Sequence, residues 1–127
     1  MLMDQIKLKI ALKDLKVINS ALENYLQLLQ MLLVSENTAQ QNIHCSIVVQ
    51  FGYQVSEKLN KRNKPDSSSL KIEVFTAFVL KDALIYYNAG NASSDYEKAI
   101  ARRIFTMIGT LLPVHSDVDN YSLQSKI

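Results

Sequence analysis

The sequence predicts a mainly α-helical protein. We expect a four-helix arrangement built from two duplicated helical hairpins related by a pseudo-twofold axis, with a short β-strand as one interpretation of the segment leading into each half. Three observations support this fold class: an internal repeat, long stretches with the apolar period of a helix, and few helix-breaking residues. The 127 residues include three glycines and two prolines, too few for a turn-rich β-sandwich and suited to long helices.

The internal repeat relates residues 8–25, LKIALKDLKVINSALENY, to residues 70–87, LKIEVFTAFVLKDALIYY. At an offset of 62 these segments share seven identities in eighteen positions, against roughly one or two expected from average composition. Further along, the apolar stripe of residues 47–59 overlays that of residues 100–112 at an offset of 53. We therefore expect residues 8–59 and 70–112 to superpose by a pseudo-twofold operation.

In the first half, apolar residues alternate with polar or small ones over residues 6–11, which is typical of a half-buried strand. From Leu15 onward the apolar spacing changes to three and four, which predicts a long helix over residues 13–34. A single continuous helix beginning at Asp4 is the alternative interpretation. Thr38 to Gln41 has the pattern of a capping box and predicts the start of a second helix that ends near Lys61.

The second half repeats this order. Alternation from Leu70 precedes a helix predicted over Thr76 to Asn88, and Gly90 is placed to end that helix in a left-handed conformation. A second capping box, Ser94 to Glu97, opens a fourth helix that Pro113 ends. The predicted organisation is one domain over residues 1–127: a first hairpin at 6–62, a hinge at 63–69, a second hairpin at 70–112 and a loosely ordered tail at 113–127.

Composition restricts the class of protein. A formal net charge of +2 is low for a strongly basic nucleic-acid binder. The single cysteine, Cys45, has no intramolecular disulfide partner, which favours a reducing compartment, so we expect a cytoplasmic protein. No run of eighteen apolar residues predicts a membrane span, and Asp4, Lys7 and Lys9 interrupt the one stretch resembling a signal-peptide core.

Two segments carry residue types that occur in catalytic or metal sites. His44 and Cys45 are adjacent, but no further ligand stands at zinc-site spacing, so Cys45 is expected to pack as a small apolar residue. His115, Ser116 and Asp117 lie in the tail, where nothing in the sequence positions them for catalysis. We therefore expect a non-enzymatic protein without a metal or cofactor.

Repeated tyrosines near the helix ends are a candidate pocket lining. Tyr25 aligns with Tyr87, and Tyr86 precedes the latter. We interpret this pair as packing residues whose hydroxyls reach water at the end of the bundle.

Basic residues suggest a second class of function. Lys58, Lys61, Arg62 and Lys64 follow the second helix, and Arg102 and Arg103 lie in the fourth. Such clusters contact phosphates, so a small nucleic-acid-binding regulator is the alternative function. The favoured interpretation is that these cations complement a helix carboxyl end and keep the surface soluble, since no aromatic residues interleave the run to stack on bases.

The leading functional hypothesis is an oligomeric assembly or adaptor subunit that acts through protein–protein contacts. Past Tyr25 the first helix continues for about two turns beyond its repeat counterpart, and this extension is strongly apolar. A contiguous apolar patch of this kind favours a homo-oligomer, with a symmetric dimer as the commonest case and the tail from Val114 as a competing cover. The predicted oligomer interface comprises Leu26, Leu28, Leu29, Met31, Leu32, Leu33 and Val34.

Overall fold

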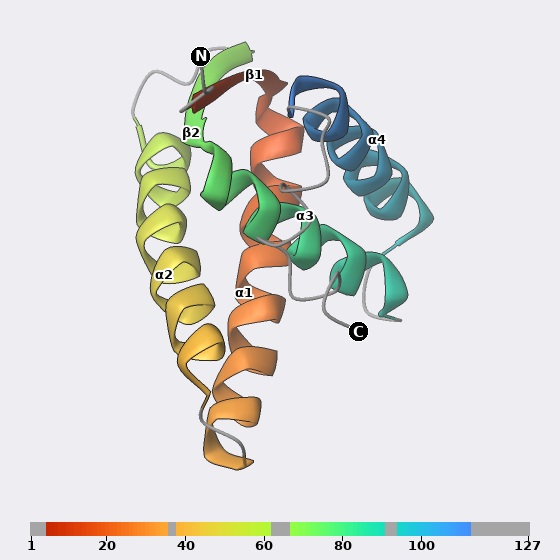
Figure 1. Cartoon of the computed structure of the whole chain (residues 1–127). Helices are drawn as coiled ribbons and strands as arrows, with labels where there is room; N and C mark the ends of the chain where they lie inside the picture. Colours follow the sequence, from red (N-terminus) through yellow and green to blue (C-terminus); the bar gives the residue numbers. More distant parts are fainter. Residues whose placement is uncertain (1–4, 36–37, 62–66, 91–93, 113–127) are drawn as a thin grey trace.

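The computed structural model describes residues 5–35, 38–61, 67–90 and 94–112. Its elements follow one another as two strand–helix–helix units along the chain (Figure 1). In order they are β1 (Gln5–Ala11), α1 (Leu12–Ser35), α2 (Ala39–Leu59), β2 (Ser67–Glu73), α3 (Val74–Ala89) and α4 (Asp95–Leu111). The described part of the chain is thus mainly helical, with one short sheet.

β1 and β2 form a two-stranded antiparallel sheet in which Leu8 lies opposite Leu70 and Lys7 lies opposite Lys71. The strand interpretation of residues 6–11 is therefore right, and the single continuous helix from Asp4 is wrong for these residues. The physical reason is the two-residue period. Ile6, Leu8 and Ile10 are buried while the lysines between them are exposed, an arrangement that a helix could not produce.

Each strand passes directly into a helix, so α1 and α3 begin slightly before the predicted residues. The predicted hinge at 63–69 is also too long. β2 already begins at Ser67, because Ser67–Ser69 pair with Ala11, Ile10 and Lys9 of β1. α2 ends at Leu59, close to the predicted Lys61.

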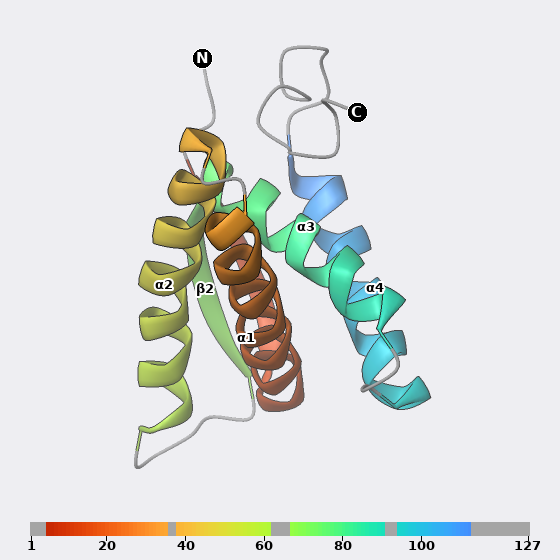
Figure 2. The same ribbon diagram turned by 90° about the horizontal axis from the view of Figure 1, so that it is seen from below.

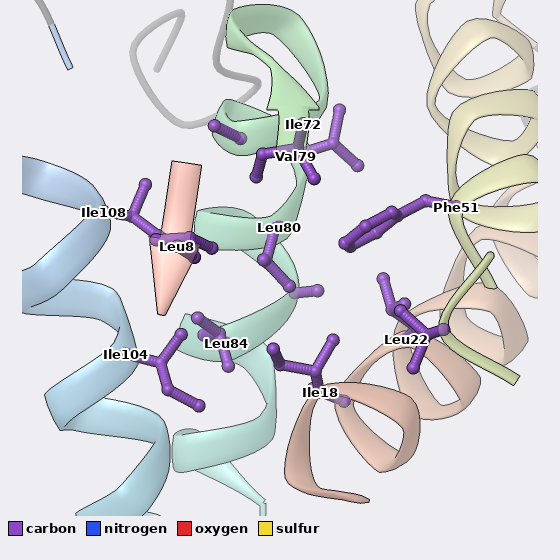
Figure 3. Packing of buried hydrophobic residues seen from close by; sticks show 14 of the residues in the cluster. Leu8, Ile18, Leu22, Phe51, Ile72, Val79, Leu80, Leu84, Ile104 and Ile108 are labelled. Atoms are coloured by element: carbon purple, nitrogen blue, oxygen red, sulfur yellow. The ribbon is translucent and has the colours of Figure 1, made fainter. Parts of the chain in front are cut away.

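The helices are arranged with α1 and α3 in the middle, as both views show (Figures 1 and 2). α2 lies along the outer side of α1, and α4 lies along the outer side of α3. The sheet covers one end of this arrangement, and its apolar face contributes Leu8, Leu70 and Ile72 to the core. Figure 3 shows Leu8 of β1 beside Ile108 of α4, and Ile72 of β2 beside Val79 of α3. Each such buried side chain stabilises the fold by about 1.5–3 kcal/mol.

Both predicted capping boxes are confirmed. The Thr38 hydroxyl accepts from the Gln41 backbone N–H at 3.2 Å, and the Gln41 side chain accepts from the Thr38 N–H at 3.2 Å. Ser94 and Glu97 form the same reciprocal pair at the start of α4, at 3.2 and 3.0 Å. The left-handed conformation predicted for Gly90 is wrong: its φ of −81° and ψ of 163° are extended, and its N–H donates to the Tyr87 carbonyl.

The first hairpin projects beyond the second. α1 has 24 residues and α3 has 16, so α1 is longer by about two turns. In Figure 1 the lower ends of α1 and α2 extend together past α3 and α4. This projecting part of the hairpin is the segment in which the oligomer interface was predicted.

Candidate functional site

His44 and Cys45, the adjacent pair considered for metal or thiol chemistry, differ in their surroundings. His44 is 1% exposed, and Cys45 is a half-buried free thiol packed against the core. Within the described residues, no group of three or more His, Cys, Asp and Glu side chains could hold a metal ion. His115, Ser116 and Asp117 lie outside the described residues.

The His44 imidazole belongs to a buried polar contact between α1 and α2. Its Nδ1 lies 3.3 Å from the Tyr25 hydroxyl, and Phe75 of α3 meets the ring edge-on with centroids 6.5 Å apart. Nε2 is buried with no hydrogen-bond partner in the structure. Burial lowers the pKa of His44, which favours the neutral ring, and it raises the pKa of Tyr25, with a further increase from Asp82. Because the imidazole is enclosed, it holds α1 to α2 and is not presented to a substrate.

Tyr87 makes a comparable contact between α3 and α4. Its hydroxyl donates to Glu97 Oε2 at 3.0 Å and shares a side-chain hydrogen bond with Ser20 of α1. Burial and the Glu97 carboxylate raise the pKa of Tyr87 to about 12. The expectation that Tyr25 and Tyr87 direct their hydroxyls to water is wrong, because both rings lie deep enough to need a protein partner. Tyr86 is the exposed one, at 40%, and its ring lies 6.4 Å from that of Tyr25.

One predicted basic residue has a structural partner. Arg103 of α4 forms an ion pair with Asp14, whose side chain is 2% exposed. The second carboxylate oxygen of Asp14 accepts from the Ala11 backbone N–H at 2.8 Å, so this side chain also caps the start of α1. Arg103 therefore fastens α4 to α1 where β1 passes into its helix.

The remaining predicted basic residues are not gathered into one surface. Lys58 is half-buried and Lys61 is exposed at the end of α2, while Arg102 is exposed in α4. α2 and α4 lie on opposite sides of the central helices in both views (Figures 1 and 2). Arg62 and Lys64 lie outside the described residues. The structure therefore brings together only part of the set of residues proposed to bind phosphate.

Sequence reasoning missed a second group of lysines, on the outer face of the sheet. Lys7 lies directly opposite Lys71, and Lys9 follows Lys7 by two residues along β1. All three are exposed. Like charges placed directly opposite are unfavourable in a sheet, but lysines also discourage edge-to-edge pairing with other strands. The alternation at residues 6–11 already indicated exposed lysines, but the strand pairing that joins them is not readable from the sequence.

The residues of the predicted oligomer interface differ in how deeply they are buried. Leu29 is fully buried within the chain, and Leu26, Leu28, Leu32 and Leu33 are half-buried because α2 covers that side of α1. Met31 is 70% exposed and Val34 is 91% exposed. The apolar surface at this end of α1 is therefore narrower than the sequence suggested.

α2 adds apolar surface that the sequence analysis did not single out. Ile43, Val49 and Tyr53 are 51%, 36% and 74% exposed. Val49 and Tyr53, with Leu22 and Leu26 of α1, line a shallow hollow of about 280 Å³ between the two helices. Val49 and Tyr53 lie off the four-residue stripe of α2, which was the available signal, whereas Ile43 lies on that stripe, was expected to face the core, and is nonetheless half exposed.

A larger hollow of about 510 Å³ lies between α2, the outer edge of β2 and the start of α3. Apolar side chains from all three elements line it, together with glutamines and a lysine–glutamate pair at the strand edge. Its lining residues are Gln5, Ile43, Ile47, Gln50, Phe51, Gln54, Lys71, Ile72, Glu73, Phe75 and Thr76. No pattern along the chain indicated this hollow, because it is assembled from four elements, Gln5 being in β1, that meet only in the folded protein.

Among the described residues, no helix is both long enough and apolar enough to span a membrane. Comparisons with protein-family models, with curated proteins and with solved structures found no match to this chain.

Proposed function

We propose that this protein is non-enzymatic and acts through protein–protein contacts, as an oligomeric assembly or adaptor subunit. The observation that carries this proposal is the concentration of exposed apolar side chains on the α1–α2 hairpin. Met31, Val34, Ile43 and Tyr53 are each at least half exposed. Apolar residues grouped in this way on one hairpin are typical of surfaces that another protein covers.

The other outer helix provides an internal comparison. α4 occupies the flank of α3 as α2 occupies the flank of α1, and Tyr96 is its one exposed large hydrophobic residue. Tyr96 lies in the first turn of α4, so the rest of its outward face is polar or half-buried. An outer helix of this fold therefore does not need an apolar outward face, and the apolar residues of α2 need another explanation.

A second copy of the chain is the proposed cover for the end of α1. The last turns of α1 extend past α3 and α4 (Figure 1). Met31 and Val34 belong to this end of α1, which finishes at Ser35, and both are exposed in the described part of the chain. In a symmetric dimer the same patch meets itself, which makes this the commonest way to bury such a surface.

We also infer that the two halves are duplicated hairpins related by a pseudo-twofold axis. Supporting this, the repeat partners Leu8 and Leu70 lie opposite each other in the sheet. At the offset of 62, Tyr25 corresponds to Tyr87. At the offset of 53, their respective partners His44 and Glu97 also correspond. Two tyrosines at matching positions thus bond to matching positions on the following helix.

The dimer is tested by light scattering behind a sizing column. The expected wild-type mass is twice 14.4 kDa, and Met31→Glu/Val34→Glu should shift it to the monomer, because two charges would have to be buried at the interface. Both positions are exposed in the single chain, so circular dichroism should remain unchanged. Tyr96→Glu, on the other hairpin, is the matched control and should leave the dimer intact. A wild-type monomer at tens of micromolar would rule out the dimer.

A further inference from the structure

The hollow of about 510 Å³ beside β2 lies along a strand edge that has no strand partner among the described residues. Its volume falls within the range of roughly 300–1,000 Å³ that is usual for ligand sites. β2 pairs with β1 on one side, and Figure 2 shows α2 alongside β2. Residues of α2 and β2 both line the hollow.

A side chain from α2 identifies which backbone groups face the hollow. Gln54 Nε2 donates to the Lys71 carbonyl oxygen at 3.5 Å, so this carbonyl points away from β1. In an antiparallel pair, alternate residues direct both their N–H and C=O groups to the same side. The backbone groups of Ser69 and Lys71 therefore point to this edge; of these two residues Lys71 lines the hollow, and the long bond from Gln54 satisfies its carbonyl weakly.

An ion pair occupies the repeat-equivalent place between α4 and α1. There Arg103 of α4 reaches across to Asp14 of α1. By the repeat offsets of 53 and 62, the positions that match Arg103 and Asp14 are Gln50 and Thr76. Both line the hollow, and neither carries a charge. The two positions that an ion pair joins in one place are thus occupied by two uncharged side chains at the repeat-equivalent place.

We infer that this hollow binds an extended, uncharged segment of a partner polypeptide, which adds as a third strand to the free edge of β2. The edge offers backbone hydrogen bonds to the segment, and the Gln50 and Gln54 amides can bond to its main chain. Ile43, Ile47 and Phe75 provide an apolar wall for every second side chain of the segment.

A strand is favoured over a helix because a helix has already satisfied its own backbone groups and would leave this edge unpaired. The inference rests on the proposed function of binding other proteins. It assigns an adaptor role to a surface separate from the dimer patch at Met31 and Val34.

The probe is a library of short random peptides displayed on phage and selected on the full-length protein. Selected peptides should carry apolar residues at alternate positions and no charged residue within the segment that binds. Their synthetic versions should bind in a fluorescence anisotropy titration, and methylation of alternate backbone nitrogens should weaken binding by about tenfold or more, because it removes the strand hydrogen bonds.

Two exposed positions give matched protein variants. Gln50→Arg places a long charged side chain in the hollow and should abolish peptide binding, whereas Gln30→Arg, on exposed α1 surface outside the hollow, should bind normally. Ile43→Arg and its control Ile85→Arg repeat the comparison at half-exposed apolar positions. Circular dichroism establishes that each variant is folded.

Failure of this inference can be distinguished from failure of the proposed dimer. Light scattering on the Gln50→Arg variant should still give the mass of the wild type. No enriched peptides, equal binding by the methylated peptides, or binding unaffected by both hollow variants would overturn the strand site. Peptide binding that appears only after removal of residues 113–127 would assign the site to the chain's own tail and overturn the partner assignment.

Discussion

At the scale of single residues, the buried polar groups are what hold the helices in their places. Asp14 joins the start of α1 to α4, and the Tyr25–His44 pair joins α1 to α2. A polar group without its partner in such a position costs far more than the hydrogen bond itself contributes. These residues are therefore where a single substitution should affect stability most clearly.

Arg103→Ala should lower the free energy of unfolding by about 1–3 kcal/mol, because it leaves the buried Asp14 carboxylate with the hydrogen bond from the Ala11 N–H and without its ion pair. Arg102→Ala is the matched control. It removes an exposed neighbouring arginine and should change stability by less than about 0.5 kcal/mol. Urea denaturation measures both. Equal effects of the two variants would show that the ion pair contributes nothing.

Stability should also depend on pH through His44. Burial lowers its pKa in the folded chain from the ordinary 6.5, so the unfolded chain takes up the proton first as pH falls. The free energy of unfolding should therefore decrease below about pH 6.5, with a slope of at most about 1.4 kcal/mol per pH unit. His44→Gln should flatten this dependence between about pH 5 and 7. Parallel pH profiles for wild type and variant would contradict the assignment.

At the scale of elements, local signals predict where helices begin more reliably than how they end. The capping boxes at Thr38 and Ser94 need only residues three positions apart, so each can form with little help from the rest of the fold. Gly90 was assigned a left-handed role because glycine usually takes it at a helix end. In the fold the chain instead leaves α3 in an extended conformation, so the residue type alone was not decisive.

Two glycines inside helices offer a test of local preference. Gly52 in α2 and Gly109 in α4 each have open space where a Cβ would stand. Replacing either by alanine should raise the free energy of unfolding by about 0.5–1 kcal/mol, because alanine loses less backbone entropy in a helix. Chemical denaturation of the single and double variants should show additive gains. A loss of stability at Gly52 would mean that another group approaches this side of α2.

At the scale of the whole molecule, the central feature is the pairing of α1 with α3. Ala21 and Ala83, which match in the repeat, are both fully buried. Small residues on two central helices allow those helices to approach closely.

Ala83→Leu should overpack this centre and lower the free energy of unfolding by about 1–3 kcal/mol. Ala21→Leu should have a similar effect if the two positions are equivalent. Ala99→Leu, at an exposed position of α4, is the control and should change stability by less than about 0.5 kcal/mol. Thermal melts compare the stability of the three variants. A large difference in stability between Ala21→Leu and Ala83→Leu would argue against the pseudo-twofold.

Much of the fold was predictable from the sequence. The order of elements, both capping boxes and the longer first helix follow from periods of two and 3.6 residues and from short-range hydrogen bonds, which depend on neighbours along the chain. The repeat aligns Leu8 with Leu70, and in the sheet these two residues lie opposite each other.

Tertiary structure alone decided how surfaces far apart in the sequence meet. It buried Leu29 under α2 while leaving Met31 exposed, joined Arg103 to Asp14 across 89 positions, and opened a hollow beside Lys71. The physical reason is that burial and charge pairing depend on which faces of different elements come together. Periodicity defines the faces of each helix and strand, but the packing of α2 and α4 determines which of those faces stay in contact with water.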